Sequence, residues 1–308
     1  MERKQAIRGV MAALTCMITL ADVAAAEDRV TLGWGRLFHN DAIGDGQDRW
    51  QSGGYTVSMM RGYSFSGELP ARPGEILEFR LSGDIAAPAN LQSPAADDRR
   101  YAGSLSLGVH THFQWNGAEV SLGGDLVVTG EQTGIGSFHS WAHDKLGAES
   151  PDPALENQIG NGFHPTLVAE IGRGFALGGA EARPFVELRA GAETMVRMGA
   201  DVTFGGFGPG DLMLRDRTTG LRYRGVAGDV QTGLTFTLGA DVARVFDSVY
   251  FPSDGAVTLS PDRMRLRAGV QWQGEHNSIF YGLSYLSPEF EEQSEGQVVG
   301  GLSLNLRF

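Results

Sequence analysis

Four side chains of the kinds that hydrolytic sites use fall in three short polar segments of the sequence. Asn40 and Asp41 follow one predicted strand, Ser52 precedes the next, and His143 lies in a longer connecting segment. A neutral imidazole can accept a proton from water near pH 7, and an amide or hydroxyl can polarise or position a reacting group. Taken singly, each has a plainer explanation, because Asn-Asp and Ser-Gly are common in turns and loop histidines are usually solvated. Whether they form a site depends on the fold that positions them.

Period-two alternation of apolar and polar residues runs through most of the chain and predicts β-strands. Residues 101–115 are the clearest case, and Asn116-Gly117 after them is a strong hairpin turn. We expect twelve strands, near residues 29–38, 54–63, 75–83, 101–115, 117–129, 165–175, 183–191, 194–206, 226–241, 263–274, 278–286 and 297–308. A closed barrel pairs every backbone group and lets one face of each strand be apolar. The predicted fold is all-β, a twelve-stranded antiparallel transmembrane β-barrel, with a soluble β-sandwich as the alternative.

The two ends of the chain indicate the bacterial outer membrane. Residues 1–26 combine a basic start, an apolar run over 9–20 and the small residues Ala24-Ala25-Ala26, which predicts a cleaved signal peptide. The alternative is a membrane anchor, but the run is shorter than the roughly 20 residues that a spanning helix needs. Residues 27–308 then form the barrel domain. Its last predicted strand ends at Phe308, which is typical of barrels handled by the outer-membrane barrel assembly machinery.

Composition excludes several classes of function. The one cysteine, Cys16, lies in the predicted signal peptide, so the barrel domain has no thiol nucleophile or disulfide. The formal net charge is −12, which does not suit a nucleic-acid partner. Glycine accounts for 44 of the 308 residues, which favours tight turns and close strand packing over helices.

Strand parity gathers the polar segments at one rim. If the chain starts in the periplasm, the connections that face outward are residues 39–53, 84–100, 130–164, 192–193, 242–262 and 287–296. The candidate residues all lie in these outer connections. Residues 137–146 predict a short amphipathic helix in an extracellular loop, with His139 and His143 one turn apart beside the face of Phe138 and Trp141. In such barrels the outer loops are long and the periplasmic turns are short. Residues 207–225 are an exception, because they form a long connection on the periplasmic side.

Six motifs in order resemble the lipid A 3′-O-deacylases of the Gram-negative outer membrane. They are Asn40-Asp41, Asp48-Arg49 with Trp50, Ser52 and Gly54, Asp98-Arg99-Arg100-Tyr101-Ala102-Gly103, Gly130 with His143 and Gly147, Asn157-Gln158-Ile159 with Asn161, and 285–291 with Gln293. The resemblance covers nearly the whole chain after the signal peptide. The sequence departs from the family at His139, where Gln is common, at Gly53, where Asn is found, and at Arg100, where Pro is usual.

The resemblance implies hydrolysis of the 3′-linked acyloxyacyl ester of lipid A at the outer rim, with calcium and with chemistry like that of secreted phospholipases A2. His143 matches the catalytic histidine that activates water. Asn40, Asp41 and Ser52 match the Asn, Asp and Ser/Thr positions of the active site. Since calcium prefers oxygen ligands, Asp41 is the expected side-chain ligand, completed by backbone carbonyls and water.

The resemblance also implies lipopolysaccharide as substrate and outer-membrane lipid as surroundings. Arg99 could pair with a lipid A phosphate, although an arginine at the outer rim more often bridges neighbouring lipopolysaccharide or loop acids. His139 could orient the substrate or replace an amide donor.

Two other functions remain open from the sequence. A non-catalytic barrel, either a channel or an inactive relative, predicts that His143→Ala changes nothing chemical. A rim lipase like phospholipase A would use a serine nucleophile, and only Ser52 is available for that role, without a pattern that marks it as activated.

Overall fold

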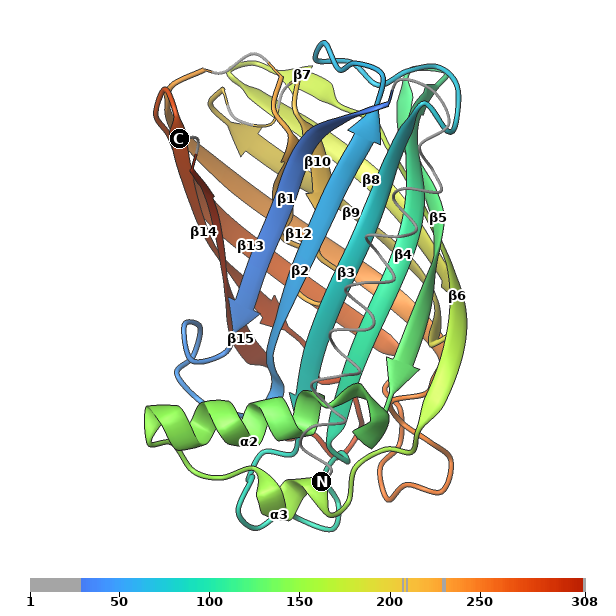
Figure 1. The fold of residues 1–308 in the computed structure, drawn as a ribbon, viewed down its shortest axis with the longest axis vertical. Helices are drawn as coiled ribbons and strands as arrows, with labels where there is room; N and C mark the ends of the chain where they lie inside the picture. The colour runs from blue at the N-terminus through green and yellow to red at the C-terminus, as the bar shows by residue number, and fades with distance from the viewer. Residues whose placement is uncertain (1–28, 207, 209, 229–230, 307–308) are drawn as a thin grey trace.

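Twelve antiparallel strands close into a barrel in the computed structural model, which describes residues 29–206, 208, 210–228 and 231–306 (Figure 1). The barrel strands are β1 (Val30–Asn40), β2 (Trp50–Gly62), β3 (Ile76–Ala87), β4 (Ala102–Trp115), β5 (Ala118–Thr129), β6 (Gly162–Gly172), β8 (Ala180–Ala190), β9 (Glu193–Phe204), β12 (Gly233–Ser248), β13 (Asp262–Gln273), β14 (Asn277–Leu286) and β15 (Gln297–Leu306). Pairing of β1 with β15 and of β6 with β8 closes the sheet. The short β7 (Phe175–Leu177) pairs with β8.

All twelve predicted strands are confirmed, but several bounds differ. The largest shift is in β12, expected over 226–241 and found at Gly233–Ser248. The alternation continues past residue 241, where Val242 and Phe246 face outward, and pairing with β9 and β13 carries the strand to the outer rim. Strands β6 and β8 each begin three residues before their predicted starts. The predicted signal peptide and Phe308 lie outside the described residues.

The barrel wall has an apolar outer face and a polar inner face, as the alternation predicts. On β12, Leu234, Phe236 and Leu238 point outward and are more than half exposed, whereas Thr235 and Asp241 point inward and are buried. Apolar side chains on the outer face suit contact with hydrocarbon. None of the helices among the described residues combines the length and the apolar character needed to cross a membrane.

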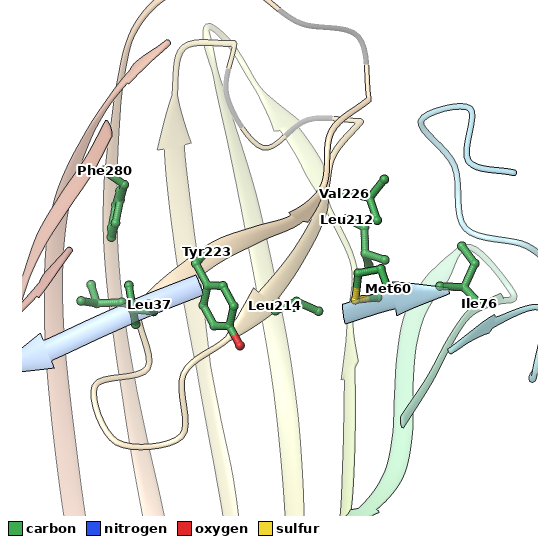
Figure 2. Close-up of a cluster of buried hydrophobic side chains, with 9 residues drawn as sticks. Leu37, Met60, Ile76, Leu212, Leu214, Tyr223, Val226 and Phe280 are labelled. Carbon is green, nitrogen blue, oxygen red and sulfur yellow. The ribbon is translucent and has the colours of Figure 1, made fainter. Parts of the chain in front are cut away.

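The long periplasmic connection folds back into the lumen as a hairpin. Its strands are β10 (Leu212–Arg215) and β11 (Arg222–Val226). Figure 2 shows its apolar side chains, among them Leu214 and Tyr223, packed with Leu37, Met60 and Phe280 from the barrel wall. The prediction of a long inner connection is thus confirmed, and its length is explained because it supplies an apolar core to one end of a polar lumen.

Glycines on β1 make room for the hairpin. A Cβ atom at Gly33 would lie 2.4 Å from the carbonyl oxygen of Gly225, and one at Gly35 would lie 2.9 Å from the Tyr223 ring. At the tip of the hairpin, Arg217 forms an ion pair with Asp84 on the barrel wall. Beyond that tip a polar cavity of about 90 Å³ remains below the rim. The hairpin therefore fills much of the lumen and supports the rim from beneath.

We expect Gly33→Val to displace the hairpin and open the lumen. The new side chain would meet backbone, which cannot yield as a flexible side chain can, and overpacking of this kind costs about 1–3 kcal/mol or more. Conductance in planar bilayers should be small for the unchanged protein and clearly larger for the variant. Gly124→Val is the matched control, because the nearest atom to a Cβ there lies 3.6 Å away. Equal conductance in the two variants would show that the hairpin does not close the lumen.

Candidate active site

The rim where β1 ends and β2 begins carries three of the predicted residues. The Asn40 side chain donates a hydrogen bond to the carbonyl oxygen of Ser52 (2.7 Å) and accepts one from the amide of Ala42 (2.8 Å). The amide of Asp41 donates to the same Ser52 carbonyl (3.2 Å). Asn40 and Asp41 thus bind the two strand ends together, and both ends of the Asn40 amide already have backbone partners.

Ser52 is the extra residue of a β-bulge. Gln51 pairs with Ala86 and Gly53 pairs with Ile85, so Ser52 has no partner on β3. Trp50 before it has φ +49°, a conformation that non-glycine residues adopt rarely and at a cost of about 1–3 kcal/mol. Bulges redirect side chains and are frequent beside active sites. The bulge therefore accounts for the position of the Ser52 hydroxyl.

The Asp41 carboxyl is buried among other acids. Only 1% of the residue is exposed, and its Oδ2 accepts a hydrogen bond from the amide of Arg49 (2.8 Å). Burial raises the pKa of Asp41 to about 8, and the charges of Asp48 and Asp45 add to the increase. Negative charge from Asp45 and Asp48 near a buried carboxyl is an environment that a hard cation such as calcium would stabilise.

The loop after β5 holds the predicted helix against the rim. It contains η1 (Glu131–Thr133), α2 (Ile135–Leu146) and α3 (Asp152–Leu155), which lie across the end of the barrel in Figure 1. A Cβ at Gly103 would meet Ile135 at 2.9 Å, and one at Gly136 would meet Leu155 at 2.7 Å. These two glycines let the helix approach β4 on one side and α3 on the other.

The helix is confirmed, but its two aromatic side chains are exposed and do not pack on the barrel. Phe138 and Trp141 are each 56% exposed and contact one another, with ring centroids 5.8 Å apart, whereas His139 is buried. In a membrane protein an apolar face at the rim can meet lipid instead of a protein core. The helix thus turns its histidines toward the barrel and its aromatic residues away from it.

His143 lies between two oxygen acceptors. Its Nδ1 contacts the carbonyl oxygen of Glu149, and its Nε2 lies 3.2 Å from Oδ2 of Asp48. Acceptors on both sides are complementary to an imidazole that carries protons on both nitrogens. Both ring nitrogens of His143 therefore have an oxygen atom close by.

His139 lies between His143 and Tyr101. Its ring centroid is 4.2 Å from that of His143 in an edge-on arrangement, and its Nδ1 is 3.2 Å from the Tyr101 hydroxyl. Burial, together with a smaller effect of the charge of His143, lowers the pKa of His139 to about 4. His139 is consequently neutral at pH 7.

Asp48 is the site residue that the sequence analysis did not select. It contacts His143, and burial raises its pKa while His143 and the Ser52 hydroxyl act in the opposite direction. Its charge also acts on Asp41. The sequence signal that could have identified Asp48 is its place at the start of the Asp48-Arg49 motif, a few residues before Ser52. Asp48 is the link between the residues of the β1–β2 rim and those of α2.

Arg99 is not open to a substrate phosphate in this structure, contrary to the role suggested for it. The residue is 3% exposed, its guanidinium pairs with Glu289 (2.6 Å), and it stacks on Phe251 with 4.9 Å to the ring centroid. Glu289 also accepts a hydrogen bond from the Gln51 side chain (2.8 Å). Arg99 therefore bridges a loop acid, the other outcome that the sequence left open.

A closed antiparallel barrel with an apolar outer face defines a class, the outer-membrane β-barrel proteins. Within it, the chain belongs to the family of outer membrane protein LpxR, whose sequence model matches residues 10–308.

Comparison with solved structures supports the barrel fold. LpxR from Salmonella typhimurium matches with a TM-score of 0.71 at 19% sequence identity, over 90% of this chain and 100% of that chain, which supports the fold. The translocator domain of the autotransporter NalP from Neisseria meningitidis matches with a TM-score of 0.44 at 12% identity, over 99% of this chain and 98% of that chain. The NanC porin matches with a TM-score of 0.43 at 6% identity, over 90% and 100%. No curated protein sequence matches the chain.

Proposed function

We propose that this protein is a lipid A 3′-O-deacylase, a carboxylic ester hydrolase that removes the 3′-linked acyloxyacyl chain at the outer rim of the barrel. The observation that carries the proposal is the contact of His143 with Asp48, whose charge acts on Asp41 and whose pKa is in turn affected by the Ser52 hydroxyl. Membership of the LpxR family supports a lipid A deacylase of the outer membrane. The proposal goes beyond family membership in naming the 3′ ester as the bond that is cleaved and in assigning roles to single residues.

The position of the site suits this substrate. Lipid A keeps its glucosamine head at the leaflet surface and its acyl chains in the hydrocarbon below. The site lies at the rim, and the exposed Phe138 and Trp141 on α2 provide an apolar border next to it. An ester between head group and acyl chain would meet the catalytic side chains at the level of the membrane interface.

His143 is the proposed general base. Its imidazole takes a proton from water as the water oxygen bonds to the ester carbonyl carbon, and the new imidazolium N–H groups face Asp48 and the Glu149 carbonyl. The imidazolium then returns the proton to the sugar oxygen as the carbon–oxygen bond breaks. The products are a carboxylic acid and an alcohol, so atoms and protons balance.

Calcium fits the donors of the rim, because Asp41 is a buried oxygen donor surrounded by further acids. Bound calcium would supply positive charge next to the oxyanion of the tetrahedral intermediate. Asp41 is the proposed side-chain ligand, with backbone carbonyls and water completing the set. Asn40 and Ser52 hold the shape of this pocket through the paired strand ends and the bulge.

An open channel and a serine lipase find less support than the deacylase. The β10–β11 hairpin in the lumen argues against an open channel. A serine mechanism would pair Ser52 with His143, but the described contacts of the His143 ring nitrogens are with Asp48 and Glu149.

Mass spectrometry of lipid A tests the proposal. The protein, purified from membranes in detergent, would be incubated with hexa-acylated lipid A in calcium or in chelator. Loss of one acyloxyacyl unit, only with calcium, is the expected result. An unchanged spectrum from folded protein would refute the deacylase function, and a trappable acyl-serine would favour the rim lipase instead.

A further inference from the structure

Three side chains at the rim could hold a metal ion of a different kind from calcium. Asp48, His139 and His143 each offer one ligand atom, and these atoms all lie within 4.8 Å of one another. They come from distant parts of the chain, the loop just before β2 and two successive turns of α2. From this arrangement we infer that Asp48, His139 and His143 form a binding site for a first-row transition-metal cation such as Zn²⁺.

The spacing fits a small tetrahedral ion. Zinc binds imidazole nitrogen and carboxylate oxygen at about 2.0–2.2 Å, which separates neighbouring ligand atoms by about 3.3 Å. Nε2 of His143 and Oδ2 of Asp48 are 3.2 Å apart. The ligand atom of His139 lies within 4.8 Å of the other two, so the three must draw closer together to bind one ion. Two histidines and a carboxylate leave one position open for water.

The outer contacts orient both histidines as metal ligands. Metal-binding histidines nearly always donate their second N–H to a carbonyl, a carboxylate or water. The Nδ1 of His143 faces the Glu149 carbonyl, and the Nδ1 of His139 faces the Tyr101 hydroxyl. Each ring can thus hold its proton on Nδ1 and present the Nε2 lone pair. Tyr101 is fully buried, so this support is rigid.

The ligand types select against calcium at this position. Calcium takes six to eight oxygen ligands, whereas two imidazoles and one carboxylate suit zinc, copper or nickel. The zinc site would therefore be separate from the oxygen donors around Asp41. If the proposed function holds, zinc would occupy the His143 nitrogen that has to accept the proton. Zinc is then a reversible inhibitor of the deacylase.

Metal binding can be measured without any activity. Protein purified in detergent would be titrated with ZnCl₂ by calorimetry, and with CoCl₂ to record the visible absorption of four-coordinate cobalt. His139→Gln should weaken zinc binding by at least about 100-fold, because loss of a ligand exceeds the 10–100-fold cost of losing an outer contact. His276→Gln, at the exposed turn between β13 and β14, is the matched control and should bind as the unchanged protein does.

The outcomes separate this inference from the proposed function. Heat-modifiable mobility on gels would verify that each variant is a folded barrel, and Tyr101→Phe provides a milder change should His139→Gln fail to fold. Stoichiometric zinc that is lost in His139→Gln supports the site even if no deacylase activity is found. Zinc binding that is absent, or equal in His139→Gln and His276→Gln, overturns the site even if the protein is an active deacylase. If the zinc site and the deacylase function are both correct, zinc inhibits the deacylase at saturating calcium. The inhibitory zinc concentration should then rise at least about 100-fold in His139→Gln. Each protein would be compared with its own rate without zinc.

Discussion

Replacing His143 with glutamine should slow deacylation of lipid A by about 10²–10⁴-fold, the range that a general base contributes. Glutamine keeps a side chain of similar reach on α2 but cannot accept the proton from water. The environment adds to the effect, because Asp48 at 3.2 Å and the Glu149 carbonyl stabilise an imidazolium and have no such role toward an amide. Initial rates of deacylation, followed by mass spectrometry at fixed calcium, would measure the change.

Two companion variants test the reason for that loss. Asp48→Asn should slow the reaction less than His143→Gln, since it weakens the stabilisation of the imidazolium but leaves the base in place. His276→Gln, remote from the rim, should react at the unchanged rate. If His143→Gln retained most of the activity in a folded barrel, water activation by this histidine would be wrong, and the search for the base would move to Asp48.

The strands of this protein could be predicted because lipid on one side and a polar lumen on the other impose a local pattern. Leu234, Phe236 and Leu238 alternate with inward polar residues, so each strand carries its own signal. Parity then placed Asn40, Asp41, Ser52 and His143 at one rim, where the structure has them. Strand bounds were less accurate, since alternation in β12 continues past the point where the prediction ended it.

The lumen hairpin could not be predicted, because its packing depends on contacts that are distant in sequence. Gly33 on β1 admits the backbone of Gly225, some 190 residues away, and neither glycine differs in sequence context from others in the chain. The same limit applies to Asp48. Its motif could be recognised in the sequence, but its contact with His143 depends on how α2 packs against the rim. The exposed Phe138 and Trp141 show a related limit, because helical periodicity predicts an apolar face but not whether protein or lipid covers it.

Replacing Asp41 with asparagine should lower the calcium affinity of the deacylase more than any other single change at the rim. Asparagine keeps the shape and can still accept the hydrogen bond from the Arg49 amide, but it cannot ionise, so it lacks the negative charge that a bound calcium ion would stabilise at this buried position. We expect the calcium concentration for half-maximal activity to rise, and the rate at a fixed calcium level to fall by about 10²–10³-fold, as for loss of an oxyanion stabiliser. Activity measured across a calcium titration, from chelator to saturation, would show both effects.

The raised pKa of Asp41 adds a pH signature to the same experiment. Calcium binds the ionised carboxylate, and protons compete with it below the pKa of about 8. The apparent calcium affinity should therefore fall by about tenfold for each pH unit below 8 and level off above it, and this slope should disappear in Asp41→Asn. Asp45→Asn removes one charge from the same loop without removing the buried ligand, so it should shift the affinity only slightly and keep the slope. If Asp41→Asn and Asp45→Asn behave alike, the rim attracts calcium by its overall charge alone, and Asp41 is not a ligand.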